Sequence, residues 1–237
     1  MIAILLLLVF LGGASSSAAD GPRVRIVNSD GTLFGVLHLS KGGEALSLTQ
    51  PNGSNVQVGR CANEEKMKVS SPDGTLHALV FERNCGATVD FASRVVLADA
   101  RGQKLLVVLE GRPQISLVWK EGRRLEVHQS KMSADQVYHQ VAQAREVTVV
   151  FVPDLRPVEA SKYLDFASFN YGATGRAAGM PREFLLRLAG WSQEASGLHR
   201  SEWGSWAGPA PYGDDPRGRA KVMDGIQYDE TMYRPKK

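Results

Sequence analysis

Two cysteines, Cys61 and Cys85, are the strongest candidates for chemistry in this sequence of 237 residues. A disulfide between them would close a loop of about 25 residues and stabilise the folded chain by about 3.5 kcal/mol in the chain-entropy model. Alternatively, Cys85 could be a nucleophile or a metal ligand, because Asn84-Cys85-Gly86 interrupts a strand pattern. A nucleophile needs a thiolate and a basic partner, and among the histidines only His77 lies nearby in sequence. The even number of cysteines favours the disulfide if the chain is exported.

Three aromatic residues, Trp203, Trp206 and Tyr212, lie among Gly and Pro near the end of the chain rather than on a periodic face. Such rings can form a stacking platform for sugars or a peptide groove, so they are the predicted binding residues. Packing of the rings against a sheet is the alternative. Ordering the segment costs about 1–2 kcal/mol per residue, which either packing or a ligand must offset.

Other catalytic and cofactor motifs are missing from the sequence. No GxSxG is present, the carboxylates are scattered, and the histidines form no HxH or HxxxH pair, so we expect no catalytic residue, no metal and no cofactor. The glycines from Gly172 to Gly179 lack dinucleotide-binding and P-loop spacing and predict a flexible connection. The histidines are His38, His77, His128, His139 and His199.

The first residues predict export. Ile2 to Leu11 is a nearly unbroken apolar run, too short to span a bilayer, and Ser17-Ala18-Ala19 is a small-x-small cleavage pattern. Residues 1–19 are therefore a predicted signal peptide, although no Lys or Arg precedes the apolar run. We expect a periplasmic or secreted protein with no transmembrane segment once the signal peptide is removed.

The charged residues are mixed along the chain, and the formal net charge is +3. A nucleic-acid surface usually requires a clustered basic stripe, so we expect no nucleic-acid partner. An anionic polymer of the cell envelope would need only a modest basic patch, which this composition allows.

Alternation of apolar and polar residues, with Gly- and Asn-rich turns between the runs, predicts a β-rich region over residues 20–152. The fold class is α+β, with a β-rich antiparallel sheet or meander, a few short helices and an irregular C-terminal extension. The apolar run Val147–Val152 suits the centre of a sheet. The predicted strands are Val24–Val27, Leu33–Leu39, Ala45–Leu48, Val56–Val58, Leu76–Glu82, Phe91–Leu97, Lys104–Leu109, Ile115–Trp119, Leu125–His128 and Val147–Val152.

Three segments have helical periodicity. Ser133 to Ala144 places Val137, Tyr138 and Val141 on one face, with Ser133 as N-cap. Two more helices are predicted in the C-terminal extension, residues 153–237, one over Val158–Phe169 and one beginning at Pro181. This extension is rich in Gly and Pro and contains three of the four Trp.

The sequence Asp-Gly-Thr-Leu occurs at residues 30–33 and again at 73–76, a spacing typical of propeller blades, but no third copy follows and a closed ring needs at least four blades. The block from Ser71-Pro72-Asp73-Gly74 through Cys85-Gly86-Ala87-Thr88 instead resembles a family of small, exported, uncharacterised bacterial proteins that share an SPDGK…VFxRxCGATTGFST block. The resemblance covers about residues 61–152 and implies fold and export, but no activity. Here Val89-Asp90 stands in place of the family's Thr-Gly, and Thr75 in place of Lys.

Two classes of function remain. The first is a non-catalytic protein that binds an envelope protein or polysaccharide, consistent with many strands and no reactive constellation. The alternative is a hydrolase acting on cell-envelope material, with a site assembled from distant carboxylates or histidines. A pocket of converging titratable residues would favour the hydrolase.

Overall fold

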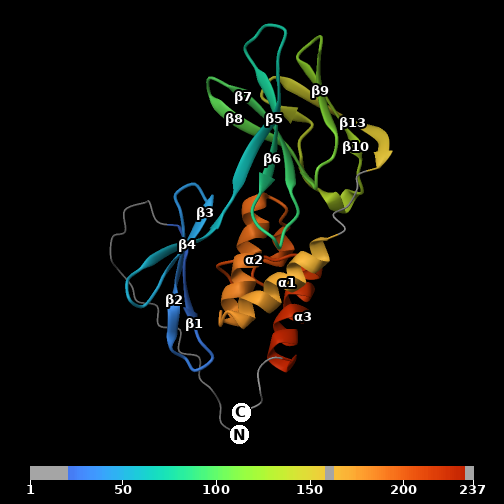
Figure 1. Ribbon diagram of the computed structural model, residues 1–237. Helices are drawn as coiled ribbons and strands as arrows, with labels where there is room; N and C mark the ends of the chain where they lie inside the picture. Colours follow the sequence, from blue (N-terminus) through green and yellow to red (C-terminus); the bar gives the residue numbers. More distant parts are fainter. Residues whose placement is uncertain (1–20, 158–162, 233–237) are drawn as a thin grey trace.

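The protein's structure, a computed structural model, describes residues 21–157 and 163–232. In this part the chain forms three β-sheets and three α-helices (Figure 1), which confirms a strand-rich α+β fold. The expected signal peptide, residues 1–19, lies outside the described residues. Among those that are described, no helix has the length and apolar character needed to cross a membrane.

The first sheet is an antiparallel meander in the order β1-β2-β3-β4. Its strands alternate as the sequence predicts, and Ile26, Leu37 and Leu46 are fully buried on one face. Asp30 fixes the first turn, since its Oδ1 accepts hydrogen bonds from the backbone N–H and the hydroxyl of Thr32 at 2.9 and 2.6 Å. The strands are β1 (Arg23–Val27), β2 (Leu33–Leu39), β3 (Ala45–Thr49) and β4 (Asn55–Arg60).

The second and third sheets pack face to face, with a shared core that includes Val80, Val95, Val107 and Leu125. The second sheet is antiparallel in the order β11-β8-β7-β6-β5, and the third has the order β12-β13-β10-β9. The second consists of β5 (Ala62–Ser70), β6 (His77–Asn84), β7 (Ala92–Asp99), β8 (Gly102–Glu110) and β11 (Val137–Gln140). The third consists of β9 (Ile115–Lys120), β10 (Arg124–Lys131), β12 (Gln143–Ala144) and β13 (Val147–Pro157).

The expectation of a purely antiparallel sheet is wrong for the third sheet, because β10 and β13 are parallel. After β10 the chain crosses to the other layer, pairs with β8 as β11, and returns through β12. A return of this kind brings the next strand back in the original direction, as parallel pairing requires. β13 lies between β12 and β10, as expected for its apolar run.

The helix predicted over Ser133–Ala144 is wrong. Only a short 3-10 helix (Ala134–Gln136) forms, and Gln136 Oε1 accepts hydrogen bonds from both the backbone N–H and the hydroxyl of Ser133. Val137 then enters β11, where the free edge of β8 offers backbone partners. A Val-Tyr sequence suits a strand at least as well as a helix, so this tertiary pairing decides the outcome.

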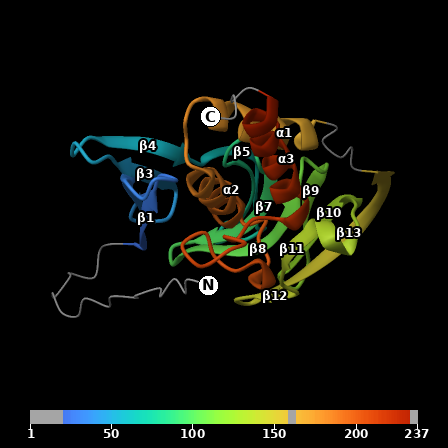
Figure 2. The same ribbon diagram turned by 90° about the horizontal axis from the view of Figure 1, so that it is seen from below.

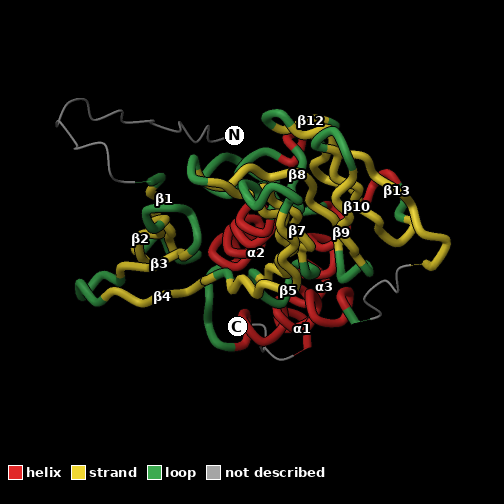
Figure 3. The backbone as a smooth tube through the Cα atoms, turned by 90° about the horizontal axis from the view of Figure 1, so that it is seen from above, coloured by secondary structure: helices red, strands yellow, loops and turns green. Residues whose placement is uncertain are grey.

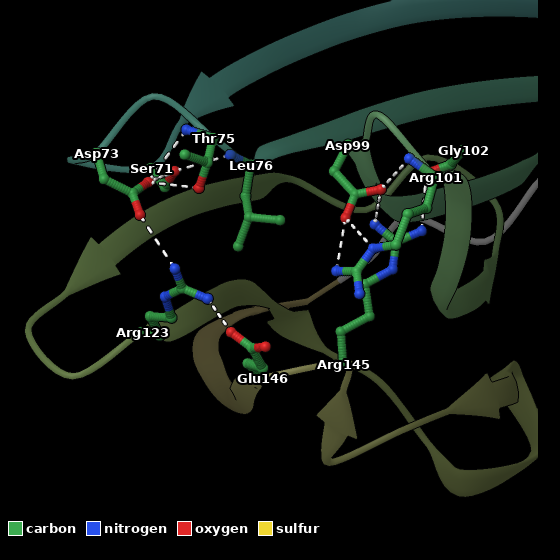
Figure 4. Close-up of polar contacts among 10 residues, drawn as sticks. All are labelled: Ser71, Asp73, Thr75, Leu76, Asp99, Arg101, Gly102, Arg123, Arg145 and Glu146. Atoms are coloured by element: carbon green, nitrogen blue, oxygen red, sulfur yellow. Dashed lines mark hydrogen bonds and ion pairs between the residues drawn. The ribbon is translucent and has the colours of Figure 1, made fainter.

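Ion pairs between turn residues connect the second and third sheets at the ends of their strands (Figure 4). Arg123, in the β9–β10 turn, pairs with Asp73 in the β5–β6 turn and with Glu146. Arg145, between β12 and β13, pairs with Asp99 at the end of β7. Both arginines have φ of 56° in tight turns. The pairs of Arg123 are exposed and contribute little stability each, so their main effect is to set the positions of the turns, whereas the side chains of Arg145 and Asp99 are only 16% and 8% exposed.

The helix α2 (Arg182–Ser196) lies between the first sheet and the other two, as the views from below and above agree (Figures 2 and 3). It starts after Pro181, as predicted, and buries Phe184, Leu185 and Trp191 against the first sheet and the base of the second. The predicted helix over Val158–Phe169 is displaced: α1 spans Leu164–Ala177, and residues 158–162 lie outside the described part. The helix α3 (Pro216–Met232) is not predicted from the sequence.

Glycines bring α1 and α3 into close contact. A Cβ atom on Gly172 would lie 2.1 Å from Val222 O, and one on Gly225 would lie 2.0 Å from Phe169 O. The prediction that Gly172 to Gly179 form a flexible connection is therefore wrong, because Gly172 lies inside α1 at a helix–helix contact.

We predict that Gly225→Ala destabilises the protein by about 1–3 kcal/mol, because its methyl group must push the α1 backbone away. Gly218→Ala in the same helix is the control. Its methyl group would meet no atom closer than 3.7 Å, and alanine has the higher helix propensity. Urea unfolding of both variants measures the difference. Equal effects of the two substitutions would contradict the close helix contact.

Candidate functional site

The two cysteines form a disulfide, as predicted, with an S–S distance of 2.06 Å and a Cα–Cα distance of 4.1 Å. Cys61 lies between β4 and β5, and Cys85 directly follows β6. The pair extends the β5–β6 ladder, whose last partners are Ala62 and Asn84. Neither thiol is free, so the alternative of a nucleophilic or metal-binding Cys85 is wrong for this state of the protein.

Arg83, two residues before Cys85, is buried with 5% of its surface exposed and binds three separate parts of the chain. Its Nε donates to Ala195 O in the last turn of α2 at 2.7 Å. Its Nη1 donates to Asn63 Oδ1 on β5 at 2.7 Å and pairs with Glu44, in the β2–β3 turn, at 3.3 Å. A buried guanidinium requires such partners, so Arg83 holds the first sheet, the second sheet and α2 together.

Arg94 lies on β7 beside Arg83. It pairs in register with Phe81, which shares a face of β6 with Arg83. Within the described residues Arg94 makes no hydrogen bond or ion pair, and its Nε is buried without a partner. Burial and the neighbouring Arg83 lower the pKa of Arg94, opposed by the carboxylate of Glu44. An arginine side chain nevertheless remains charged in proteins, so this cation lacks a bonded counter-charge.

Two cavities adjoin at these arginines, and we call their combined surface the arginine groove. The first cavity, of about 380 Å³, covers the face of β5–β8. The second, of about 370 Å³, lies between the β2–β3 turn and α2. Glu44, Arg83 and Arg94 line both. The first is also lined by Asn63, Phe81, Val96, Gln103 and Leu105. The second is also lined by Leu39, Gly42, Gly43, Trp191, Glu194, Ala195 and Trp206.

The charged side chains that line the groove differ in whether they have a bonded partner. Arg83 is paired with Glu44, and Glu194 accepts a hydrogen bond from the backbone N–H of Trp206. Arg94 remains as the cation without a bonded partner in the described groove. A guanidinium in this position can bind a carboxylate or a phosphate through two parallel hydrogen bonds.

The residues of the groove were not nominated from the sequence, although a signal exists. Leu79, Phe81 and Arg83 share one face of β6 because side chains alternate along a strand. A charged residue in phase with apolar ones therefore predicts a buried or partly buried charge. Arg94 is likewise in phase with Val96 on β7.

The three aromatic residues predicted to bind a ligand do not form one surface. Trp206 is 2% exposed and belongs to the core around α2, although it also borders the second cavity. Trp203 is half-buried and its ring lies 6.3 Å from the ring of Tyr138. Tyr212 is half-buried and its ring lies 4.3 Å from the guanidinium carbon of Arg187. Packing explains the order of this segment, and a binding role for the three rings stays a prediction.

Arg187 fixes the segment that contains these rings. It is buried, and its Nη1 donates to the carbonyl oxygens of Trp206 and Gly208 at 2.6 and 2.9 Å. Residues 201–215 of the expected irregular extension are thus held onto α2 by specific hydrogen bonds.

Two carboxyl groups with raised pKa values lie in or beside this segment. Asp214 is 1% exposed, and the contact between its carboxyl group and the backbone N–H of Asp215 is too weak to satisfy either oxygen within the described residues. Burial, helped by the charge of Asp215, raises the pKa of Asp214 to about 7. Burial, with Asp90, Asp215 and Asp135, also raises the pKa of Glu110 to about 7, opposed by Arg217. Neither Asp214 nor Glu110 lines either cavity of the arginine groove.

Comparisons of the chain with protein-family models, with curated proteins and with solved structures find no match. The resemblance of residues 61–152 to a family of exported bacterial proteins therefore stays a prediction.

We predict that stability falls as pH rises from about 4 to about 7. The folded protein keeps protons on Asp214 and Glu110 over this range, whereas the unfolded chain releases them near pH 4. Asp214→Asn should remove much of this fall and make the protein more stable than the parent at pH 8. Urea unfolding between pH 4.5 and 8 tests this, with the exposed Glu202→Gln as control. An unchanged pH slope in Asp214→Asn would be the contrary result.

We also predict that Trp206→Ala costs about 3–5 kcal/mol, as for other buried Trp residues. Trp203→Ala should cost less, because its ring is only half-buried. Thermal melts of the two variants make the comparison. A Trp206→Ala variant with the same melting temperature as the parent protein would show that Trp206 is not part of the core.

Proposed function

We propose that this protein is a non-catalytic binding protein of the cell envelope, periplasmic or secreted, that binds a carboxylate-bearing polysaccharide in the arginine groove. The observation that carries the proposal is Arg94, a partly buried cation without a bonded partner at the junction of two cavities. A carboxylate would supply the missing counter-charge. The disulfide is compatible with an oxidising compartment.

A polysaccharide fits the lining better than a peptide. The side-chain amide of Gln103 can bond hydroxyl groups, as can the second amide hydrogen of Asn63, whose other amide groups bond Arg83 and Glu44. The half-buried ring of Phe81 offers an apolar surface beside them. The groove lies on the face of a sheet rather than at its edge, so it offers no backbone ladder for a peptide strand.

The hydrolase alternative receives less support. It requires titratable groups that converge in a pocket. The carboxyl groups with raised pKa, Asp90, Glu110 and Asp214, instead lie outside the arginine groove, and none of them lines either of its cavities.

We predict that Arg94→Gln weakens binding of a hyaluronan hexasaccharide by about 10- to 100-fold, the worth of a charge-assisted hydrogen-bonded pair of about 1.5–3 kcal/mol. Isothermal titration calorimetry measures the affinity, with neutral maltohexaose as the control ligand. Arg25→Gln, which removes an exposed charge on β1, is the control variant with the same change in net charge.

Equal losses in Arg94→Gln and Arg25→Gln would contradict a specific site, since they would indicate binding by overall charge. Thermal melts of Arg94→Gln should match the parent, because Arg94 holds no other described element. Mass spectrometry of the recovered hexasaccharide should show it intact. Shortened products would contradict the non-catalytic assignment and favour the hydrolase.

A further inference from the structure

We propose that the ligand is a polysaccharide with a carboxylate on every second sugar, bound with one carboxylate at Arg94 and a neutral sugar in each cavity. This inference rests on the proposed function of the arginine groove. It follows from how the fixed charges are distributed along the groove.

The groove has the form of two compartments joined at one cation. Both cavities are bordered by Glu44, Arg83 and Arg94, so the arginines stand at the junction rather than at an end. Each volume lies at the lower end of the range for small-molecule sites. A ligand that contacts Arg94 and fills both cavities must therefore be an extended chain with its anionic unit in the middle.

The second cavity disfavours another anion. It is bordered by the carboxylates of Glu44 and Glu194, whereas the nearby Arg83 is already engaged by Asn63, Ala195 and Glu44. A second carboxylate placed there would face these two like charges, and Arg83, whose charge is already balanced by Glu44, would offset them only in part. Repulsion of this kind selects against the wrong ligand as effectively as attraction selects the right one.

The first cavity also suits a neutral unit. Apart from the shared junction residues, its lining consists of Phe81, Val96 and Leu105, with the uncharged amides of Asn63 and Gln103. Amides can bond hydroxyl or acetamido groups, and the apolar side chains can cover the face of a sugar ring. The order along the groove is thus neutral, anionic, neutral.

The test compares hexasaccharides of two charge patterns. Hyaluronan carries a carboxylate on alternate sugars, and oligogalacturonate carries one on every sugar. Calorimetry should show that the hyaluronan hexasaccharide binds at least about 10-fold more tightly than hexagalacturonate, and about 10-fold more tightly than the hyaluronan disaccharide, which cannot fill both cavities.

Glu44→Gln should reduce the difference in affinity between the hyaluronan hexasaccharide and hexagalacturonate. It should do so by strengthening hexagalacturonate binding, because it removes the repulsive charge while keeping an oxygen for Arg83. Asp224→Asn, an exposed change on α3, should leave the preference as it is. Tighter binding of hexagalacturonate by the parent protein, or an unchanged preference in Glu44→Gln, would overturn this inference while leaving anion binding at Arg94 in place. Failure of both hexasaccharides to bind would overturn the proposed function as well.

Discussion

The buried guanidinium of Arg83 is the contact on which the arrangement of this protein depends. A charge removed from water must be matched by nearby partners, and Arg83 finds them on β5, in the β2–β3 turn and at the end of α2. The Cys61–Cys85 disulfide, two residues further along the chain, fixes the ends of the strands beside it. Both are located where the first sheet, the second sheet and α2 meet, so the three parts are held in one relative position.

The same contact explains why a binding site is located here. Arg83 uses the carboxylate of Glu44, and this leaves Arg94, its neighbour on β7, without a bonded counter-charge. The C-terminal segment completes the wall of the second cavity through Trp206, which Arg187 holds by its carbonyl oxygen. Asp214, a buried carboxyl group of the same segment, has a raised pKa, so its protonation influences the stability of the part that forms the wall.

Much of the fold could be predicted from the sequence, because alternation and turn residues are local signals. The elements that were missed have causes that the local sequence does not contain. The strand β5 is charged and mostly exposed, and charged side chains on an edge strand discourage further strand pairing. Its alternation of apolar and polar residues is therefore weak. The helix α3 contains Gly218 and Gly225, which lower helix propensity, and Gly225 is needed only because α1 packs against it.

The disulfide was predicted correctly because two cysteines leave a single intramolecular pairing. The arginine groove was not predicted, since it depends on long-range contacts such as that between Arg83 and Ala195. The aromatic residues of the C-terminal segment were predicted to bind a ligand, yet Trp206 is buried in the core. An isolated aromatic ring among glycines is therefore weaker evidence of a site than a charged residue in phase with apolar ones on a strand.

The most direct measurement is a nitrogen-15 NMR titration of the arginine Nε–H signals with the hyaluronan hexasaccharide, with Arg94 assigned from the spectrum of Arg94→Gln. The Nε–H of Arg94 has no partner in the described structure, whereas that of Arg83 is bonded to Ala195 O. We expect a saturable shift of the Arg94 signal at the affinity found by calorimetry and little change at Arg83. A titration in which exposed arginines shift and Arg94 does not would contradict it.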